Sequence, residues 1–305
     1  MSEAINWPSG KVIRLHNVLC AYCGRLFDHE LLPTKEHVIG RRFVPRGCFD
    51  GQWNLLLNAC VACNREKSDL EDDISAISML PDLTGRFAVD DPRLASEAKR
   101  KAVKSRSRRT GRAVADSQEN FTMRHQFGNA TFTFNFTSPA QIDEDRAFTL
   151  ASYHFKGFFY WITYKKELRR GHFVKGVFFP FMVAKRADWG NAHLRWFMEC
   201  VRDWNLRVHA VGADGFFKIL IRRHPEDLEV WAWALEWNHG IRVAGFAGDE
   251  KVLLTLAGDM PPLAMRLIHQ DAQSWIRTRT EIPLPPAEDD LFVLRGADGT
   301  AVITE

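Results

Sequence analysis

The hydrophobic positions in the first 80 residues form short runs separated by turn residues, a pattern typical of short strands in a small unit. From residue 60 the spacing of apolar positions becomes helical, and Ser68-Asp69-Leu70-Glu71 has the form of a capping box. This predicts a helix that begins at Ser68 and runs towards Met79. The predicted strands are residues 12–19, the run 36–39 and residues 53–57.

The pattern changes beyond residue 120, where apolar and aromatic positions become denser and the runs longer. Residues 121–127 and 131–136 flank the turn pair Gly128-Asn129, which predicts a β-hairpin. Helical spacing predicts four further helices, at residues 142–170 with a bend near Gly157, 192–204, 225–240 and 261–279. Short apolar runs predict four further strands, at residues 207–211, 216–222, 241–246 and 251–256.

These elements predict an α+β protein in three parts. Residues 1–90 form a small N-terminal unit, residues 91–118 a basic linker or helix, and residues 119–305 a mixed α+β domain. A chain of 305 residues with 46% apolar side chains is long enough for two domains, and this composition excludes wholesale disorder.

The sequence offers no membrane or export signal. The longest nearly uncharged stretch, residues 147–164, contains His154 and Lys156 and predicts a buried or amphipathic helix instead of a membrane span. The first residues, MSEAINWPSGK, lack the apolar centre of a signal peptide. We therefore expect a cytoplasmic protein without a membrane partner.

Four of the six cysteines form two Cys-x2-Cys pairs, Cys20 with Cys23 and Cys60 with Cys63. Two thiolates on a tight turn fit two corners of a tetrahedral zinc ion, so two such pairs complete a closed site. A closed site has no open position for substrate, which predicts structural Zn²⁺. The alternative is a redox pair beside unrelated core cysteines.

Polar groups suited to phosphodiester hydrolysis lie between and beside the cysteine pairs: Glu36-His37, then Asn54, then Asn64. This reaction needs a base to deprotonate water, a group that orients the base, and a divalent cation that stabilises the charged phosphorane and the leaving oxygen. Imidazole titrates near neutral pH, and carboxylate and amide oxygens suit a hard cation. Each residue alone also fits a structural role, such as a helix cap for Asn64, so only their combination favours catalysis.

In this order the residues resemble the HNH endonuclease family, in the subtype that carries a four-cysteine zinc site. The match covers residues 15–80 and consists of Cys20-x2-Cys23, Glu36-His37, Asn54-Leu55 and Cys60-x2-Cys63-Asn64-x2-Lys67. The resemblance implies a ββα-metal fold and an endonuclease, a metal-dependent hydrolase of phosphodiester bonds that cuts DNA and leaves a 3′-hydroxyl.

The resemblance also implies roles for single residues. His37 would be the general base and Asn54 the residue that orients it. Glu36 and Asn64 would bind the catalytic cation, Mg²⁺ or Mn²⁺. This chain has Glu36 where Asp is commoner, Asn64 where His is also frequent, and Gly40 where the family often has Pro. An amide oxygen is a weaker ligand than imidazole for softer metals, which shifts the preference towards magnesium.

The positive charge of the chain is concentrated in residues 96–112, which carry eight Lys or Arg and one acid. Together with Arg65 and Lys67 from the resemblance, these cations are candidates for contacts to nucleic-acid phosphates. The alternative is a solvated linker, the usual role of a charged run. The eight cations are Lys99, Arg100, Lys101, Lys104, Arg106, Arg108, Arg109 and Arg112.

The C-terminal domain carries no motif that assigns it a role. It holds eight of the ten tryptophans, which we expect in its core. The leading hypothesis is therefore a nuclease that acts on nucleic acid, with DNA as the expected substrate. The alternatives are a non-catalytic zinc module that only binds nucleic acid, and a zinc scaffold whose C-terminal domain recognises a partner. The oligomeric state stays open.

Overall fold

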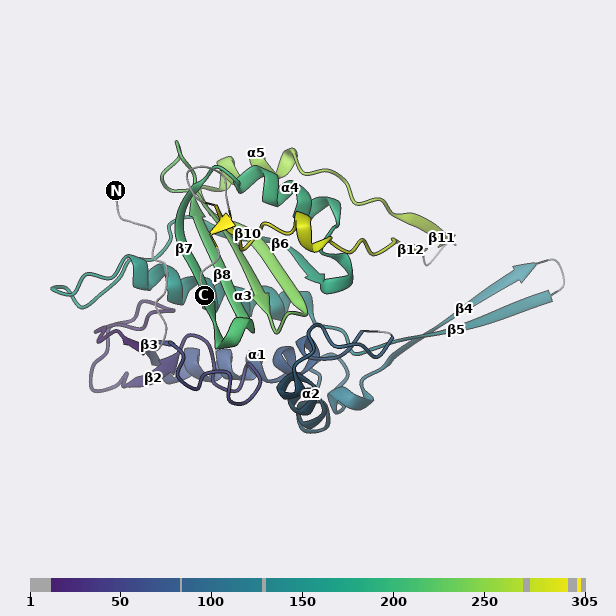
Figure 1. Cartoon of the computed structure of the whole chain (residues 1–305), viewed down its shortest axis with the longest axis horizontal. Coiled ribbons are helices and arrows are strands. Elements are labelled where there is room, and N and C mark those ends of the chain that lie inside the picture. The colour runs from purple at the N-terminus through teal and green to yellow at the C-terminus, as the bar shows by residue number, and fades with distance from the viewer. Residues whose placement is uncertain (1–11, 83, 128–129, 271–274, 296–300, 303–305) are drawn as a thin grey trace.

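The N-terminal part is a three-stranded sheet followed by one helix. The structure, a computed structural model, describes residues 12–82, 84–127, 130–270, 275–295 and 301–302. The first elements are β1 (Ile13–Arg14), β2 (Pro33–His37), β3 (Leu55–Cys60) and α1 (Val61–Ser78). Strand β1 is parallel and β2 antiparallel to the central β3. Helix α1 follows β3 directly, so β2, β3 and α1 are in ββα order (Figure 1).

The start of α1 differs from the sequence-based expectation. The three predicted strands correspond to β1, β2 and β3, but the predicted helix start at Ser68 is wrong because α1 begins at Val61. Its buried residues include Lys67, Leu70 and Ile74, so packing of one face against the sheet determines the helix. Glu71 does not cap a helix end but accepts a hydrogen bond from Lys67.

The basic region begins with a second helix, α2 (Pro92–Lys104). The side chain of Asp91 caps its N-terminus by accepting a hydrogen bond from the backbone N–H of Arg93, and proline occupies the first turn. The remaining basic residues lie in a loop that leads to the next strand.

The predicted hairpin is confirmed as β4 (Glu119–Phe127) and β5 (Ala130–Ser138). The two strands pair with each other along their full length, and the ribbon stands out from the body of the molecule (Figure 1). The predicted turn at Gly128-Asn129 lies outside the described residues.

Helix α3 (Glu144–Ile162) is shorter than predicted and runs without a break through Gly157. A Cβ atom at Gly157 would lie 2.6 Å from Cγ1 of Val38, so glycine at this position allows α3 to pack closely on the chain just after β2. The helix ends at Ile162 instead of residue 170, and the following turn is closed by a bridge between Lys165 and Arg170.

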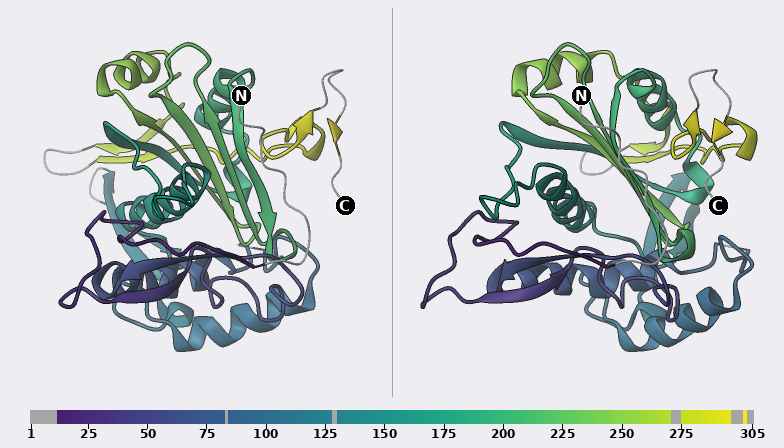
Figure 2. Two further views of the ribbon diagram at one scale, coloured as in Figure 1. Left: turned by 90° about the vertical axis from the view of Figure 1, so that its left-hand side faces the viewer. Right: turned by 60° about the vertical axis from the view of Figure 1, so that its left-hand side comes forward.

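The C-terminal region is built on a five-stranded antiparallel sheet with the order β6-β10-β9-β8-β7. One face packs against α3 and the N-terminal unit, and the other face packs against α4 and α5 (Figure 2). These elements are β6 (Val177–Lys185), α4 (Ala192–Val201), β7 (Asn205–Gly212), β8 (Phe217–Arg223), β9 (Trp231–Trp237), β10 (Ile241–Gly248) and α5 (Glu250–Gly258).

The predicted helix at residues 225–240 is wrong, because β9 is a central strand. Every residue of β9 is buried, since helices cover both faces of the sheet. Trp233 and Leu235 belong to the core beside α3, whereas Ala232 and Ala234 belong to the core beside α4 and α5. A strand buried on both faces loses the alternation of polar and apolar residues that identifies a half-buried strand.

Two further predictions in the C-terminal region are wrong. Residues 251–256, predicted as a strand, belong to α5, whose N-terminus is capped by the side chain of Asp249. Residues 261–279, predicted as a helix, contain the antiparallel strands β11 (Arg266–Gln270) and β12 (Trp275–Thr278). The last strands are β13 (Leu294–Arg295) and β14 (Ala301–Val302), which pair with each other.

The N-terminal unit and the C-terminal sheet share one hydrophobic core. The indole N–H of Trp53, next to β3, donates a hydrogen bond to the carbonyl of Val211 at 2.9 Å. The side chain of Asn238 donates to the carbonyl of Phe43 and to the hydroxyl of Ser78 at 3.1 and 2.8 Å. None of the helices in the described part of the chain has the length and apolar content needed to cross a bilayer.

Candidate functional site

The four cysteines of the two Cys-x2-Cys pairs converge on one point. The sulfur atoms of Cys20, Cys23, Cys60 and Cys63 all lie within 4.8 Å of one another, and the Sγ atoms of Cys23 and Cys60 are 3.8 Å apart. Tetrahedral zinc with Zn–S bonds of about 2.3 Å requires sulfur atoms about 3.8 Å apart. The donor set and its spacing therefore fit a metal ion such as zinc, as the sequence predicted.

Local structure explains why the thiols meet. Cys20 and Cys23 lie on the turn between β1 and β2, where Gly24 has a φ of 75° that glycine adopts without strain. Cys60 ends β3 and Cys63 lies in the first turn of α1. The backbone N–H of Cys60 donates to Sγ of Cys20, which ties the two turns together.

One cation stands beside the cysteine cluster. Nη2 of Arg25 is 3.7 Å from Sγ of Cys60. Burial alone would raise the pKa of Cys23, but hydrogen bonds from the backbone and side chain of Arg25, together with those from Cys20 and Cys63, outweigh burial and lower this pKa to about 6. A lowered thiol pKa favours the thiolate, which is the form that binds metal.

His37 lies at the end of β2 and is half-buried. Partial burial lowers its pKa, and the nearby cations Arg41 and Lys35 lower it further. The ring is therefore neutral at neutral pH, which is the form that can accept a proton from water.

Glu36 lies one residue earlier, on the opposite face of β2, because successive side chains of a strand alternate. It is buried against α1, where its Oε1 is 2.8 Å from Nζ of Lys67 and accepts a hydrogen bond from the hydroxyl of Tyr22. Burial raises the pKa of Glu36, although Lys67 opposes this effect. Within the described residues no hydrogen bond engages its Oε2.

Lys67 is the centre of a buried polar cluster and not the surface cation that the sequence predicted. Its side chain is 1% exposed and contacts Glu36 at 2.8 Å and Glu71 at 2.6 Å. The amine also donates to the backbone carbonyl of His37 at 3.1 Å. Lys67 therefore fixes the end of β2 and cannot reach a phosphate at the surface, because its position on α1 faces the sheet.

Glu71 and His154 complete this cluster, and the sequence did not single out either of them for the site. Oε1 of Glu71 accepts a hydrogen bond from the backbone N–H of Gly40 at 3.0 Å, so Lys67 and Glu71 together hold both ends of the loop after His37. His154 comes from α3 and lies 3.7 Å from Oε1 of Glu71. Burial lowers the pKa of His154 to about 4 and keeps it neutral.

The two asparagines hold backbone and neighbouring side chains in place. Asn54, just before β3, donates from Nδ2 to the carbonyl of Ile39 at 2.9 Å and so ties down the loop after His37. Its buried Oδ1 has no hydrogen-bond partner within the described residues. Asn64, in the first turn of α1, donates to Oγ1 of Thr34 at 3.0 Å. Thr34 is two residues before Glu36 on β2, so Asn64 and Glu36 border the same face of that strand.

The basic segment divides into buried, paired and free cations. Lys101 is buried, which lowers its pKa. Arg100 pairs with Glu97, Arg108 with Asp69 and Arg109 with Glu119. Of the candidate phosphate contacts, those that are exposed and without an ion pair among the described residues are Arg65 on α1 and Lys99, Lys104, Arg106 and Arg112 in the basic segment.

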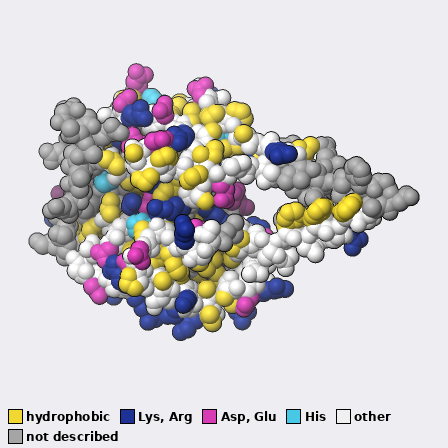
Figure 3. Space-filling model, turned by 45° about the vertical axis from the view of Figure 1, so that its right-hand side comes forward, with side chains coloured by type: hydrophobic (Ala, Val, Ile, Leu, Met, Phe, Trp, Pro, Cys, Tyr) yellow, Lys and Arg dark blue, Asp and Glu magenta, His cyan; other side chains and the backbone are white. Residues whose placement is uncertain are grey.

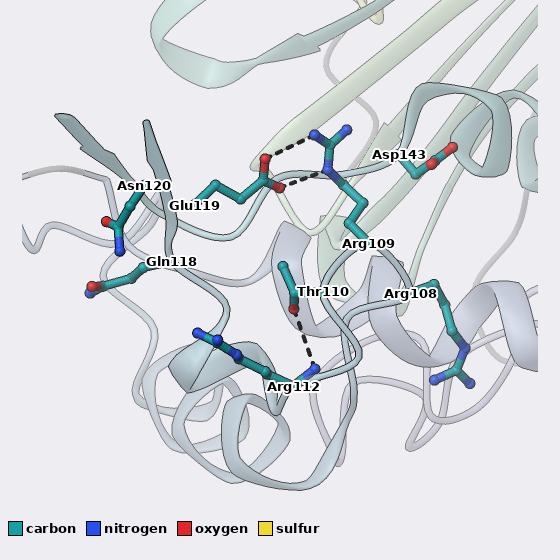
Figure 4. Close-up of a pocket in the computed structure, with 8 residues that line it drawn as sticks. All are labelled: Arg108, Arg109, Thr110, Arg112, Gln118, Glu119, Asn120 and Asp143. Carbon is teal, nitrogen blue, oxygen red and sulfur yellow. Dashed lines mark hydrogen bonds and ion pairs between the residues drawn. The ribbon is translucent and has the colours of Figure 1, made fainter. Parts of the chain in front are cut away.

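A polar cavity of about 730 Å³ lies at the root of the β4–β5 hairpin. Arg108, Arg109 and Arg112 line it together with the amide side chains of Gln118 and Asn120 (Figure 4). Glu119 holds Arg109 through two hydrogen bonds, whereas no dashed line joins the guanidinium of Arg112 to another of the residues drawn. The carboxylates of Glu119 and Asp143 also line this cavity, so its lining carries both signs of charge.

Comparisons of the chain with protein-family models, with curated proteins and with solved structures found no match.

We expect Lys67→Met to destabilise the protein by about 3–5 kcal/mol, because it leaves Glu36 and Glu71 buried without a counter-charge. Urea unfolding at neutral pH measures the free energy of unfolding. Lys35→Met is the matched control, since Lys35 is exposed on β2 and its loss should change stability by less than about 0.5 kcal/mol. Equal stability of the two variants would contradict the proposed role of Lys67.

Proposed function

We propose that this chain is a metal-dependent endonuclease whose catalytic unit is the N-terminal sheet and α1. The observation that carries the proposal is the placement of His37 at the end of β2, directly before a loop; Lys67, Glu71 and Asn54 hold this junction by three separate hydrogen bonds. A catalytic base needs such a fixed position. The cysteine cluster at the other end of β3 supplies a second anchor for the same small sheet.

His37 would act as the general base that takes a proton from water. Its lowered pKa supports this role because the ring stays unprotonated at neutral pH. Glu36, through its unengaged Oε2, and the amide oxygen of Asn64 are the groups that would hold Mg²⁺ or Mn²⁺, which supplies charge stabilisation at the phosphate. Zn²⁺ at the four cysteines would be structural.

DNA is the substrate we propose, and the exposed cations are the groups that would hold its backbone. Lys and Arg side chains gather along the lower edge of the molecule, the side on which α2 lies (Figure 3). Contacts to phosphates position a duplex without reading its sequence.

The proposed function is tested by a screen of the purified protein against plasmid DNA and RNA with several divalent cations, beside His37→Ala. We expect nicking of DNA with Mg²⁺ or Mn²⁺ by the wild type and none by the variant. Intact substrate under every condition would contradict the proposal.

A second candidate is a non-catalytic zinc module that binds nucleic acid. The observation that favours it is the buried ion pair of Glu36 with Lys67, which already supplies that carboxylate with a cation. In this case the protein cuts no substrate in the same screen, whichever divalent cation is added, but a separate binding assay shows that it binds DNA.

The salt dependence of DNA binding tests the role of the exposed cations. If about four of them contact phosphates, the logarithm of the affinity should fall against the logarithm of the salt concentration with a slope of about −3 to −4. The double variant Arg106→Gln/Arg112→Gln should lower the magnitude of this slope by about 2. Arg100→Gln is the control, because Arg100 is already paired with Glu97. Identical slopes for wild type and double variant would exclude both arginines from the contact.

A further inference from the structure

A second cavity, of about 720 Å³, lies where the N-terminal unit meets the C-terminal region. Its walls come from the end of α1 and the loop that follows it, from the residues after β5, from the end of β6 and from the segment around Leu284. Small-molecule sites usually have volumes of about 300–1,000 Å³ and occur preferentially where domains meet. The size and the position of this cavity therefore fit a small organic ligand.

Most of the side chains that line this cavity are apolar. Leu80 and Phe87 come from the loop after α1, Ala140 from the chain after β5, and Ile241 from the start of β10. Ligand pockets are typically lined in this way, with a few polar groups that orient the ligand. We therefore expect a ligand with an apolar body, and the charged groups of the wall indicate which charge it carries.

Three acids line the cavity, and two of them are bound by other groups of the chain. The two carboxylate oxygens of Asp289 accept hydrogen bonds from Arg242 at 2.8 and 2.6 Å. Oδ1 of Asp82 accepts from the backbone N–H and the hydroxyl of Thr84 at 2.8 and 2.7 Å. Only the third acid, Glu281, has a carboxylate without a hydrogen bond or an ion pair within the described residues.

Three cations line the same cavity: Arg86, Lys185 and Arg186. None of the three has an ion pair with another described residue. Arg186 lies over the ring of Trp189, with its guanidinium carbon 5.4 Å from the ring centroid. Cations without an ion pair therefore outnumber the one carboxylate without a partner, and this imbalance favours an anion in the cavity.

Lys185 is the cation whose surroundings point most directly to a ligand. It is the last residue of β6 and is half-buried. Within the described residues its amine donates one hydrogen bond, to Oε1 of Gln141 at 2.7 Å, whereas a lysine ammonium has three donors. Burial lowers the pKa of Lys185, although the carboxylates of Glu281 and Glu119 oppose this effect. A partly buried cation with a single neutral partner becomes more stable when an anion binds beside it.

We propose that this cavity binds a small organic anion, a molecule with an apolar, ring-sized body and one carboxylate or phosphate group that contacts Lys185. The apolar walls would hold the body, and Arg86 and Arg186, which are both exposed, would add positive charge near the acid group. The site is independent of the proposed nuclease activity, because neither His37 nor a cysteine of the cluster lines it.

Titration of the full chain with anilinonaphthalene sulfonate, an aromatic anion that fluoresces in apolar sites, tests the proposal when naphthalene derivatives compete with the dye. Naphthoate and naphthyl phosphate should displace it, and the one that does so at the lower concentration identifies the acid group that the site prefers. Naphthamide has the same shape as naphthoate but no charge, and it should bind about 10-fold to 100-fold more weakly, because it lacks a charge-assisted hydrogen bond. No displacement by either anion, or equal displacement by naphthoate and naphthamide, would overturn the proposal.

Two variants locate the bound anion. Lys185→Met keeps the apolar stem and should weaken the binding of naphthoate about 10-fold to 100-fold while leaving naphthamide unchanged. Lys166→Met is the matched control, since Lys166 is exposed and does not line the cavity, and it should bind as the wild type does. Ala187 is an exposed residue of the wall, so Ala187→Trp should fill the cavity without disturbing the core and should abolish displaceable binding. Unchanged affinity for naphthoate in Lys185→Met or in Ala187→Trp would overturn the proposal.

Discussion

Cys60→Ser will release the metal and unfold the N-terminal sheet and α1, while the C-terminal sheet keeps most of its structure. The N-terminal unit has only three short strands and one helix, and structural zinc contributes about 10–16 kcal/mol to the folding of small zinc peptides. The C-terminal sheet retains the core that it forms with α4 and α5. The packing between the C-terminal sheet and α3 should become less stable, because the N-terminal unit contributes to the same hydrophobic core.

Hydrogen exchange of backbone amides, read by mass spectrometry, measures this result region by region. Protection should be lost in β2, β3 and α1 and kept in β8, β9 and β10. Cys200→Ser is the matched control, since Cys200 lies on α4 outside the cluster and should leave both regions protected. Unchanged protection of β2 and α1 in the metal-free protein would show that the thiols do not hold this unit together.

If the chain is the proposed nuclease, His37→Ala will lower the rate of DNA cleavage by about 100-fold to 10,000-fold while DNA binding survives, because a positioned general base contributes this much to the rate. His29→Ala is the matched control, since His29 is an exposed histidine of the same unit and should leave the rate unchanged. Single-turnover cleavage of a plasmid measures the rate, and a binding assay with Ca²⁺ in place of Mg²⁺ measures affinity. Equal rates for the two variants would remove His37 from the mechanism.

The pH dependence of cleavage gives a second test of the same residue. A base must be unprotonated, so the rate should fall as the pH drops through the pKa of His37. Burial and the cations Arg41 and Lys35 lower this pKa, so the fall should occur below the usual histidine value of about 6.5. If the pH profile of the cleavage rate had its midpoint above this value, His37 in these surroundings would not be the group that titrates.

Local signals in the sequence predicted the N-terminal strands and the β4–β5 hairpin, because alternation and turn residues act over a few positions. In the C-terminal region the same signals predicted α4, β7, β8 and β10, but they failed for β9 and α5. Trp233 and Ala234 are both buried on opposite faces of β9, so no polar residue marks the alternation. The residues 251–256 form a helix because Asp249 caps it and Leu253 packs on the sheet, although their apolar run also suits a strand.

The convergence of the four cysteines could be predicted because the spacing within each Cys-x2-Cys pair fixes the geometry locally. The buried cluster could be predicted only in part. Lys67 and Glu71 are four residues apart on one helix face, a spacing that favours an ion pair. His154 is 83 residues further along the chain, and no local sequence pattern predicted that it joins this cluster. Its contact with Glu71 depends on the packing of α3 against α1.

We expect four thiolates to hold zinc at the root of the sheet that carries His37. X-ray absorption at the zinc edge of the purified wild-type protein measures the ligands of the ion. The spectrum should show one zinc ion per chain with four sulfur neighbours at about 2.3 Å. A folded protein without zinc, or a zinc ion with nitrogen or oxygen neighbours in place of sulfur, would show that the cysteine cluster is not a zinc site.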